Sequence, residues 1–165
     1  MSDFVVRPLR PQEAAHVAAW AYEPPHDIYN GDPEHPDDYL AVDGDGYGYY
    51  AIATADDDEV VGFCCFGSEA RVRGQASEPG TLDVGGGVRP DRVSQRLATQ
   101  AFPLILEFGR EKFQPRRFRT AVAAFNERSL RLCERAAFQE VRRFEGPGRE
   151  FVELVRLDEA DADPD

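Results

Sequence analysis

The sequence predicts an α/β fold of the α+β kind, with a central mixed β-sheet of about 6–7 strands flanked by about 4 helices. Three observations predict it. Two apolar runs flank an acidic turn between residues 47 and 67, which is the pattern of a β-hairpin. Strand and helix patterns alternate from residue 81 to residue 145, which predicts a parallel strand pair. A second hairpin closes the chain around "GPG".

The first part of the chain predicts one strand, one helix and a long loop. "FVVRPL" (residues 4–9) has the composition of a strand. Apolar side chains three and four residues apart, ending with Tyr22, indicate a helix over residues 10–22. Residues 23–46 are rich in Pro, Gly and Asp, so we expect an irregular stretch with one short helix near "PDDYLAV". Long loops in compact domains often carry function.

The second part predicts the sheet and its crossover helices. "TLDVGGGV" (residues 81–88) is a strand weakened by glycines, and residues 92–113 show helical spacing. Pro103 falls inside that helix and should kink it or remove a backbone hydrogen bond. "RRFRTAVAA" is a strand, and the next helix opens with Asn126, a good N-cap.

The length predicts a single domain over residues 1–157, followed by a disordered acidic tail over residues 158–165. A net charge of −12 argues against nucleic acid or an anionic membrane as a general partner, because both need a basic surface. The chain has no long apolar run and no signal-peptide pattern, so we expect a cytoplasmic protein. Its three cysteines lack metal-ligand spacing and are expected to be reduced.

The element order, with "LDVGGGVRPDR" leading to "AFNERSLRLCERAAFQEV", resembles the GNAT superfamily of acetyl-CoA-dependent N-acetyltransferases. The resemblance covers the chain from Phe4 to about Leu157 and includes the "V-x-P" of Val88, Arg89 and Pro90. It implies a GNAT-like fold in which two parallel strands splay apart and the pantetheine arm of acetyl-CoA lies in the gap.

The resemblance also implies a set of acetyl-CoA-binding residues. Main-chain groups of the splayed strand bind the pantetheine, and a turn at a helix N-terminus binds the pyrophosphate, which is a favourable place for an anion. On this sequence those residues are Gly86, Gly87 and Val88, the turn Val93, Ser94, Gln95, Arg96, Leu97 and Ala98, and Asn126.

Three positions depart from the family pattern, and the first is Val93, where the family has Gln or Arg. Arg96 stands where the turn has its central glycine, and its side chain either blocks the pyrophosphate or binds it through the guanidinium. Cys133 stands seven residues after Asn126, where many members have a tyrosine that acts as general acid. Cys133 is a candidate for the same catalytic role, and core packing is the alternative.

Asp83, on the splayed strand, is the candidate catalytic base, and a solvated strand-edge acid is the alternative. Tyr22, His26 and Tyr29 are candidate substrate-binding residues, because aromatic rings close to acidic residues suit a cationic amine. The alternative is an ordinary acidic loop that Tyr22 or Tyr29 anchors to the core. The loop histidines have no third ligand in register, so we expect no metal site.

Two functions stay open. The first is an enzyme that moves acetyl from acetyl-CoA to a primary amine of a small molecule or peptide by direct attack. The second is a catalytically impaired GNAT-like scaffold that binds a ligand or another protein. A homodimer is compatible with either function.

Overall fold

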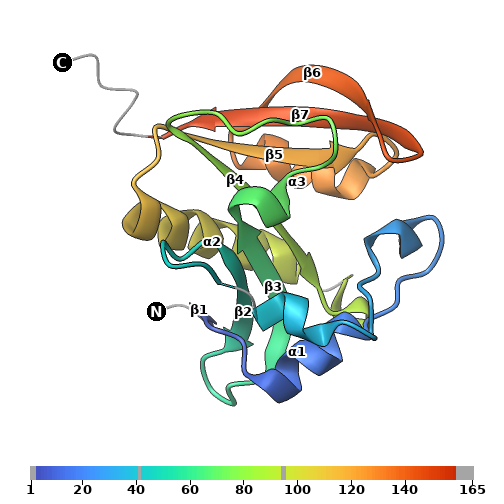
Figure 1. Ribbon diagram of the computed structural model, residues 1–165, viewed down its shortest axis with the longest axis vertical. Coiled ribbons are helices and arrows are strands. Elements are labelled where there is room, and N and C mark those ends of the chain that lie inside the picture. Colours follow the sequence, from blue (N-terminus) through green and yellow to red (C-terminus); the bar gives the residue numbers. More distant parts are fainter. Residues whose placement is uncertain (1–2, 41, 94–95, 159–165) are drawn as a thin grey trace. The chain divides into compact units, whose positions relative to one another are not determined.

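The structure, a computed structural model, describes residues 3–40, 42–93 and 96–158 (Figure 1). Its seven-stranded mixed sheet has the strand order β1-β2-β3-β4-β5-β7-β6, and β4 and β5 form a parallel pair. The described residues also form three α-helices and four short 3-10 helices. The predicted α/β class with a mixed sheet is therefore confirmed, with three α-helices where we expected about four.

The strands and α-helices follow one another in the order β1 (Phe4–Arg7), α1 (Pro11–Ala18), β2 (Gly48–Thr54), β3 (Val60–Phe66), β4 (Thr81–Val88), α2 (Leu97–Phe113), β5 (Arg117–Ala123), α3 (Glu127–Arg135), β6 (Gln139–Gly146) and β7 (Arg149–Leu157). The short 3-10 helices are η1 (His26–Tyr29), η2 (Pro36–Leu40), η3 (Gly67–Ala70) and η4 (Pro90–Arg92). The short helix expected near "PDDYLAV" is therefore η2. No helix among the described residues is long and apolar enough to cross a membrane.

Contacts within the chain group it into two compact units. Unit 1 comprises Met1–Cys65 and Gly86–Ile105, and unit 2 comprises Phe66–Gly85 and Leu106–Asp165. Both β4 and α2 contribute residues to each unit. The single domain expected over residues 1–157 stays a prediction.

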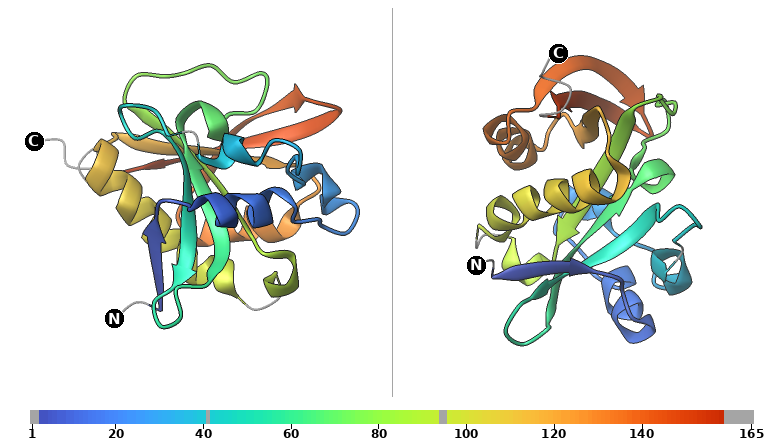
Figure 2. Two further views of the ribbon diagram at one scale, coloured as in Figure 1. Left: turned by 60° about the horizontal axis from the view of Figure 1, so that its bottom comes forward. Right: turned by 90° about the vertical axis from the view of Figure 1, so that its left-hand side faces the viewer.

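In unit 1, α1 packs against the β1–β2–β3 part of the sheet (Figure 2). Leu9, Val17 and Ala51 form a buried cluster there, and half-buried aromatic side chains surround it, among them Trp20, Tyr39, Tyr49 and Phe63. Burial of this apolar face is what stabilises so short a helix.

α1 ends earlier than the spacing predicted, at Ala18 rather than residue 22. Pro24 and Pro25 follow closely and cannot continue a helix. Tyr22 therefore lies in a loop, where its backbone N–H donates to Asn30 Oδ1 over 2.7 Å. The early end of α1 frees the Tyr22 side chain from the helix face on which the sequence had placed it.

In unit 2, β5 pairs with β7 along its full length, and β6 and β7 form the closing hairpin (Figure 1). The second half of α2 packs closely on this unit: a Cβ on Gly109 would lie 2.9 Å from the Leu82 side chain. α3 begins at the predicted cap, where Asn126 Oδ1 accepts from the Ser129 N–H over 3.3 Å.

α2 runs through Pro103, which is exposed, so the proline does not end the helix. The helix starts at Leu97 rather than at residue 92, because Pro90–Arg92 form a 3-10 turn before it.

The expected start of a disordered tail at residue 158 is wrong by at least one residue. Asp158 is buried, its backbone N–H donates to Arg116 O over 3.0 Å, and its carboxylate accepts from Arg110 Nε over 2.5 Å. The rest of the expected tail, residues 159–165, lies outside the described residues.

Candidate functional site

The end of β4, in unit 1, continues beyond the residues that pair with β5. Parallel pairing joins Thr81–Asp83 to Arg117–Arg119, whereas β4 itself runs on to Val88. On the other edge, the Arg89 N–H donates to Val61 O over 2.8 Å. Because main-chain groups alternate between the two edges of a strand, Val88 directs its N–H and C=O away from β3.

The glycines of β4 have a structural reason that needs no ligand. A Cβ on Gly86 would lie 2.6 Å from the backbone oxygen of Phe63, and one on Gly87 would lie 2.8 Å from the Phe63 ring and 3.2 Å from the Tyr22 hydroxyl oxygen. The two distances under 3.0 Å are shorter than real Cβ contacts, so the close approach of Phe63 on β3 disfavours a side chain at either position.

Arg96, just before α2, has a backbone conformation that is more typical of glycine. Arg96 is exposed and has φ of +57°, in the left-handed region that glycine adopts most readily. Its C=O accepts from the Gln100 N–H over 3.3 Å, so Arg96 immediately precedes the helix. Holding an L-residue in this conformation costs roughly 1–2 kcal/mol.

The other predicted turn residues divide into described and undescribed ones. Val93 has helical dihedrals, Leu97 is buried at the start of α2, and Ala98 is half-buried. Ser94 and Gln95 lie outside the described residues. The first N–H groups of an α-helix have no partner within the helix and carry partial positive charge, so the start of α2 suits an anion.

Tyr22 is the predicted substrate residue that reaches β4. Its hydroxyl donates to the Val88 C=O over 2.8 Å. Burial, with a smaller contribution from the nearby Tyr39, raises the pKa of Tyr22 to about 12, so the phenol stays protonated at neutral pH and can donate.

His26 and Tyr29 lie together on the neighbouring turn η1, with ring centroids 6.3 Å apart. The three predicted substrate residues thus share one loop, because Tyr22 is bonded to Asn30 directly after η1. Among the described residues, no group of three His, Cys, Asp or Glu side chains gathers where a metal ion could bind.

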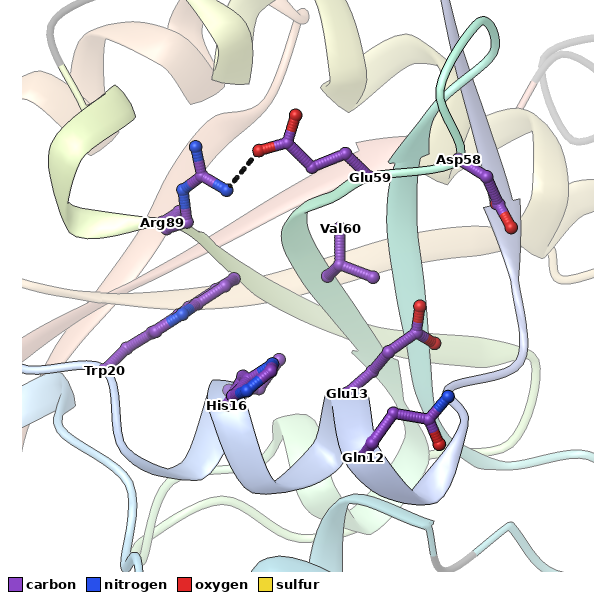
Figure 3. A pocket seen from close by; sticks show the side chains of 9 residues that line it. Gln12, Glu13, His16, Trp20, Asp58, Glu59, Val60 and Arg89 are labelled. Carbon is purple, nitrogen blue, oxygen red and sulfur yellow. Dashed lines mark hydrogen bonds and ion pairs between the residues drawn. The ribbon is translucent and has the colours of Figure 1, made fainter.

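A pocket of about 360 Å³ lies beside α1 in unit 1 (Figure 3). The indole of Trp20 and the imidazole of His16 line one side, and the ion pair of Arg89 with Glu59, 2.6 Å long, lines the other. The remaining lining residues are Gln12, Glu13, Val17, Asp58 and Val60. Arginines hold all three of its carboxylates, so the pocket contains little uncompensated charge.

In unit 2, Asp83 belongs to a buried ionic network rather than to a solvated strand edge. Arg119 Nε donates to Asp83 Oδ1 over 2.6 Å, and both side chains are only 3% exposed. Arg71 donates to the other carboxylate oxygen over 3.1 Å. Arg119 also donates to the backbone oxygen of Ala76, so the network ties the loop before β4 to the sheet.

A second carboxylate, Glu153 on β7, joins this network through Arg119, whose Nη1 lies 3.8 Å from Glu153 Oε1. It accepts from Gln75 Nε2 over 2.9 Å and from Arg142 Nε over 3.2 Å. Burial alone raises a carboxyl pKa, but the bonds from Gln75 and Arg142 outweigh burial and hold the pKa of Glu153 below its ordinary value.

The two predicted residues of α3 are both buried in unit 2. Asn126 caps the helix, and Cys133 is 4% exposed. Burial raises the pKa of the Cys133 thiol to about 12, with a smaller contribution from Glu134. Such a thiol stays protonated but is a weaker acid than an ordinary cysteine.

Sequence comparison assigns the family. The model of the acetyltransferase (GNAT) domain matches residues 3–139. The chain belongs to the GNAT family of acetyltransferases. A search of curated proteins found no match.

Solved structures share the GNAT fold over nearly the whole chain. AAC(6′)-Ib in a complex with acetyl-CoA superposes with a TM-score of 0.75 at 14% identity, covering 99% of this chain and 98% of that one. A GNAT-family acetyltransferase from Bacillus anthracis gives 0.72 at 13% identity, covering 94% and 95%. The ribosomal-protein-S5-alanine acetyltransferase from Vibrio fischeri gives 0.63 at 12% identity, covering 96% and 95%.

Sequence reasoning missed the partners of Asp83. Arg119 carries a signal that could have revealed them, because it lies within the crossover strand of the predicted sheet, where an arginine that becomes buried needs a counter-ion. Trp20 and the pocket beside α1 were missed as well, since the spacing had placed that segment within a longer helix.

Proposed function

We propose that this GNAT chain is an N-acetyltransferase that uses acetyl-CoA and acetylates a primary amine of a small molecule or peptide. The observation that carries the proposal is the left-handed backbone of Arg96 at the start of α2. Arg96 adopts the left-handed conformation that glycine adopts most readily, which supports its place at the position of the family's central glycine.

Three groups of residues would hold acetyl-CoA, which supplies the activated acetyl group when bound. The main chain of Gly86, Gly87 and Val88 would bind the pantetheine beyond the short parallel pairing of β4. The turn from Val93 to Ala98 would bind the pyrophosphate through main-chain N–H groups. Asn126 stays a proposed contact from α3.

Proton transfer by Asp83 and Cys133 stays a prediction, and the geometry sets its cost. Both oxygens of Asp83 accept from arginines, so protonation of Asp83 as a base would remove the negative charge from a buried ion pair. The raised pKa of Cys133 makes proton donation to a thiolate less favourable. We therefore propose that binding and orientation of the amine supply most of the rate enhancement.

The loop that carries Tyr22, His26 and Tyr29 is the proposed acceptor-binding region. Aromatic faces and an acidic protein surface favour a cationic amine. AAC(6′)-Ib has also been solved with ribostamycin and coenzyme A, and another structural neighbour acetylates the alanine of a ribosomal protein. Aminoglycosides and alanine-containing peptides are therefore the first acceptor classes to assay.

The alternative is a binding module, a catalytically impaired scaffold that binds a ligand or another protein. It rests on Val93, Arg96 and Cys133, which depart from the family pattern, and on Pro103 within α2. The Arg96 guanidinium stands at the turn, and Cys133 replaces the usual tyrosine. A scaffold of this kind would bind an amine or a protein but would release no coenzyme A thiol.

Calorimetric titration with acetyl-CoA, followed by an assay of thiol release with each acceptor class, tests the proposal. At 100 times the dissociation constant, the ligand should add about 2.7 kcal/mol to the free energy of unfolding. No heat and no rise in Tm at millimolar acetyl-CoA would refute the enzyme. Binding without thiol release for any amine would favour the binding module.

Two variants of Arg96 separate the effect of its backbone conformation on coenzyme A binding from the effect of its side chain. R96A removes the guanidinium but keeps a Cβ in the left-handed conformation, whereas R96G removes both. We expect R96G to bind coenzyme A at least as tightly as the unmodified chain and to be more stable than R96A by about 1 kcal/mol. Equal loss of binding in both variants would show that the guanidinium, not the backbone, holds the anion.

A further inference from the structure

The hydroxyl of Tyr22 joins two segments that lie 66 residues apart in the sequence. It donates to the Val88 C=O over 2.8 Å, and the contact is partly buried. The same oxygen lies 3.2 Å from the place where a Cβ on Gly87 would stand. The phenol thus lies over the last two residues of β4, within unit 1.

The position of Val88 makes this bond important. Val88 directs its main-chain groups away from β3, to which the next residue, Arg89, is bonded. A carbonyl oxygen has two lone pairs, so the bond from Tyr22 leaves one acceptor direction for a ligand. The bond also limits rotation of the peptide that follows Val88, and hence the direction of that carbonyl.

Tyr22 is itself held in place on both sides. Its backbone N–H donates to Asn30 Oδ1 over 2.7 Å, and Asn30 directly follows η1. The raised pKa of the phenol, caused mainly by burial, keeps the donor protonated across the physiological range. The contact is therefore present at any pH at which acetyl transfer would be assayed.

We propose that Tyr22 is a positioning residue, whose hydroxyl fixes the Val88 peptide in the orientation that binds coenzyme A. The proposal rests on the proposed function, because it assigns the end of β4 to the coenzyme. It gives Tyr22 a role through the strand rather than through the acceptor amine, which was its expected partner.

Tyr22→Phe removes only the hydroxyl. One hydrogen bond of this kind corresponds to about a three- to tenfold change in an equilibrium constant. We expect the coenzyme A dissociation constant and the KM for acetyl-CoA to rise by that factor, while kcat changes less than twofold. Asn30→Ala, which loosens the loop that carries Tyr22, should raise the same constants by a smaller factor.

Tyr50→Phe is the matched control. Its buried hydroxyl also donates to a backbone carbonyl, that of Gly46, over 2.6 Å in the same unit. Both variants should lower Tm to a similar extent, because each loses one phenol-to-carbonyl bond. Only Tyr22→Phe should weaken coenzyme A binding, a difference that a purely structural hydroxyl does not produce.

The possible outcomes distinguish failure of the proposed function from failure of the positioning role of Tyr22. If the unmodified chain does not bind coenzyme A, the proposed function fails. If it binds and Tyr22→Phe binds equally well, the positioning role alone is refuted. Tighter binding by Tyr22→Phe also refutes that role, because it would mean that the hydroxyl competes with the coenzyme for Val88.

Discussion

The first half of β4, in unit 2, is fixed by buried charge, whereas its second half, in unit 1, is fixed by close packing and a neutral phenol. Asp83 is held by Arg119 and Arg71 at a site that is 3% exposed. Gly86 and Gly87 instead lie directly against Phe63, with Tyr22 bonded to Val88. One strand thus carries two different kinds of anchor.

The two halves of β4 differ in what contact with a ligand would cost the protein. Breaking a buried ion pair leaves an uncompensated charge and is costly. The half of β4 that contains Asp83 is therefore suited to a fixed structural role. The packed half, Gly86–Val88, has no charged side chain to desolvate. A bound molecule could contact its main-chain N–H and C=O groups. This difference supports the proposed binding of coenzyme A at the second half of β4 and a structural role for the first half.

The largest effect should come from breaking the charged anchor. Arg119→Met leaves Asp83 buried without its closest partner, and we expect it to lower the free energy of unfolding by about 3–5 kcal/mol, measured by urea denaturation. Arg131→Met is the matched control, because Arg131 and Glu127 form an exposed pair on α3. That control should change stability by less than about 0.5 kcal/mol. Equal effects in the two variants would mean that burial does not strengthen the Asp83 anchor.

A smaller effect should come from adding one methyl group to the packed half. Gly86→Ala places a Cβ 2.6 Å from the Phe63 backbone oxygen, and the strand must shift to accept it. Overpacking of this kind costs about 1–3 kcal/mol, which a thermal melt can measure. Gly44→Ala serves as control, since nothing lies within 4 Å of its Cβ. A Gly86→Ala protein as stable as the control would contradict the close approach of β3 to β4.

The smallest effect is the response to acid, which should differ between the two halves. The pKa of Glu153 is lower in the folded protein than its ordinary value of 4.5. Its contribution to the free energy of unfolding is therefore fully present above pH 4.5 and is lost as the pH falls from there through the folded-state pKa. Amide hydrogen exchange should therefore lose protection at Thr81–Gly85 sooner than at Gly86–Val88 as the pH falls from 5 to 3, roughly the range in which carboxylates protonate. Glu153→Gln should reduce this difference. Loss of protection at the same pH in both halves would refute the division.

The sequence predicted the elements and the fold class well, because periodicity reports directly on which faces are buried. Asn126 was identified as a cap from its residue type, and the bond to Ser129 confirms it. The end of α1 was misplaced because the apolar spacing continues to Tyr22 after the helix has stopped. The helix ends at Ala18 with tight bonds from the Ala19 and Trp20 N–H groups to the carbonyls of His16 and Val17, and Pro24 and Pro25 only keep it from resuming.

The candidate site was less predictable, because its important contacts join residues far apart in the chain. The bond from Tyr22 to Val88 and the pairing of Asp83 with Arg119 both depend on the tertiary fold. The left-handed dihedral of Arg96 could not be inferred from an arginine, which seldom adopts it. The sequence showed a departure from the family pattern at that position, and the structure adds that the Arg96 backbone is left-handed.

The pairing of Asp83 with Arg119 also bears on how the chain folds. The two residues stand opposite each other in the parallel register of β4 and β5. A slip of one residue would turn one of these side chains to the other face of the sheet and bring apolar Leu82 or Val84 beside the guanidinium. Such a mis-paired strand would bury a cation without its counter-ion, so the ion pair favours the native alignment of β4 with β5 over a slip of one residue.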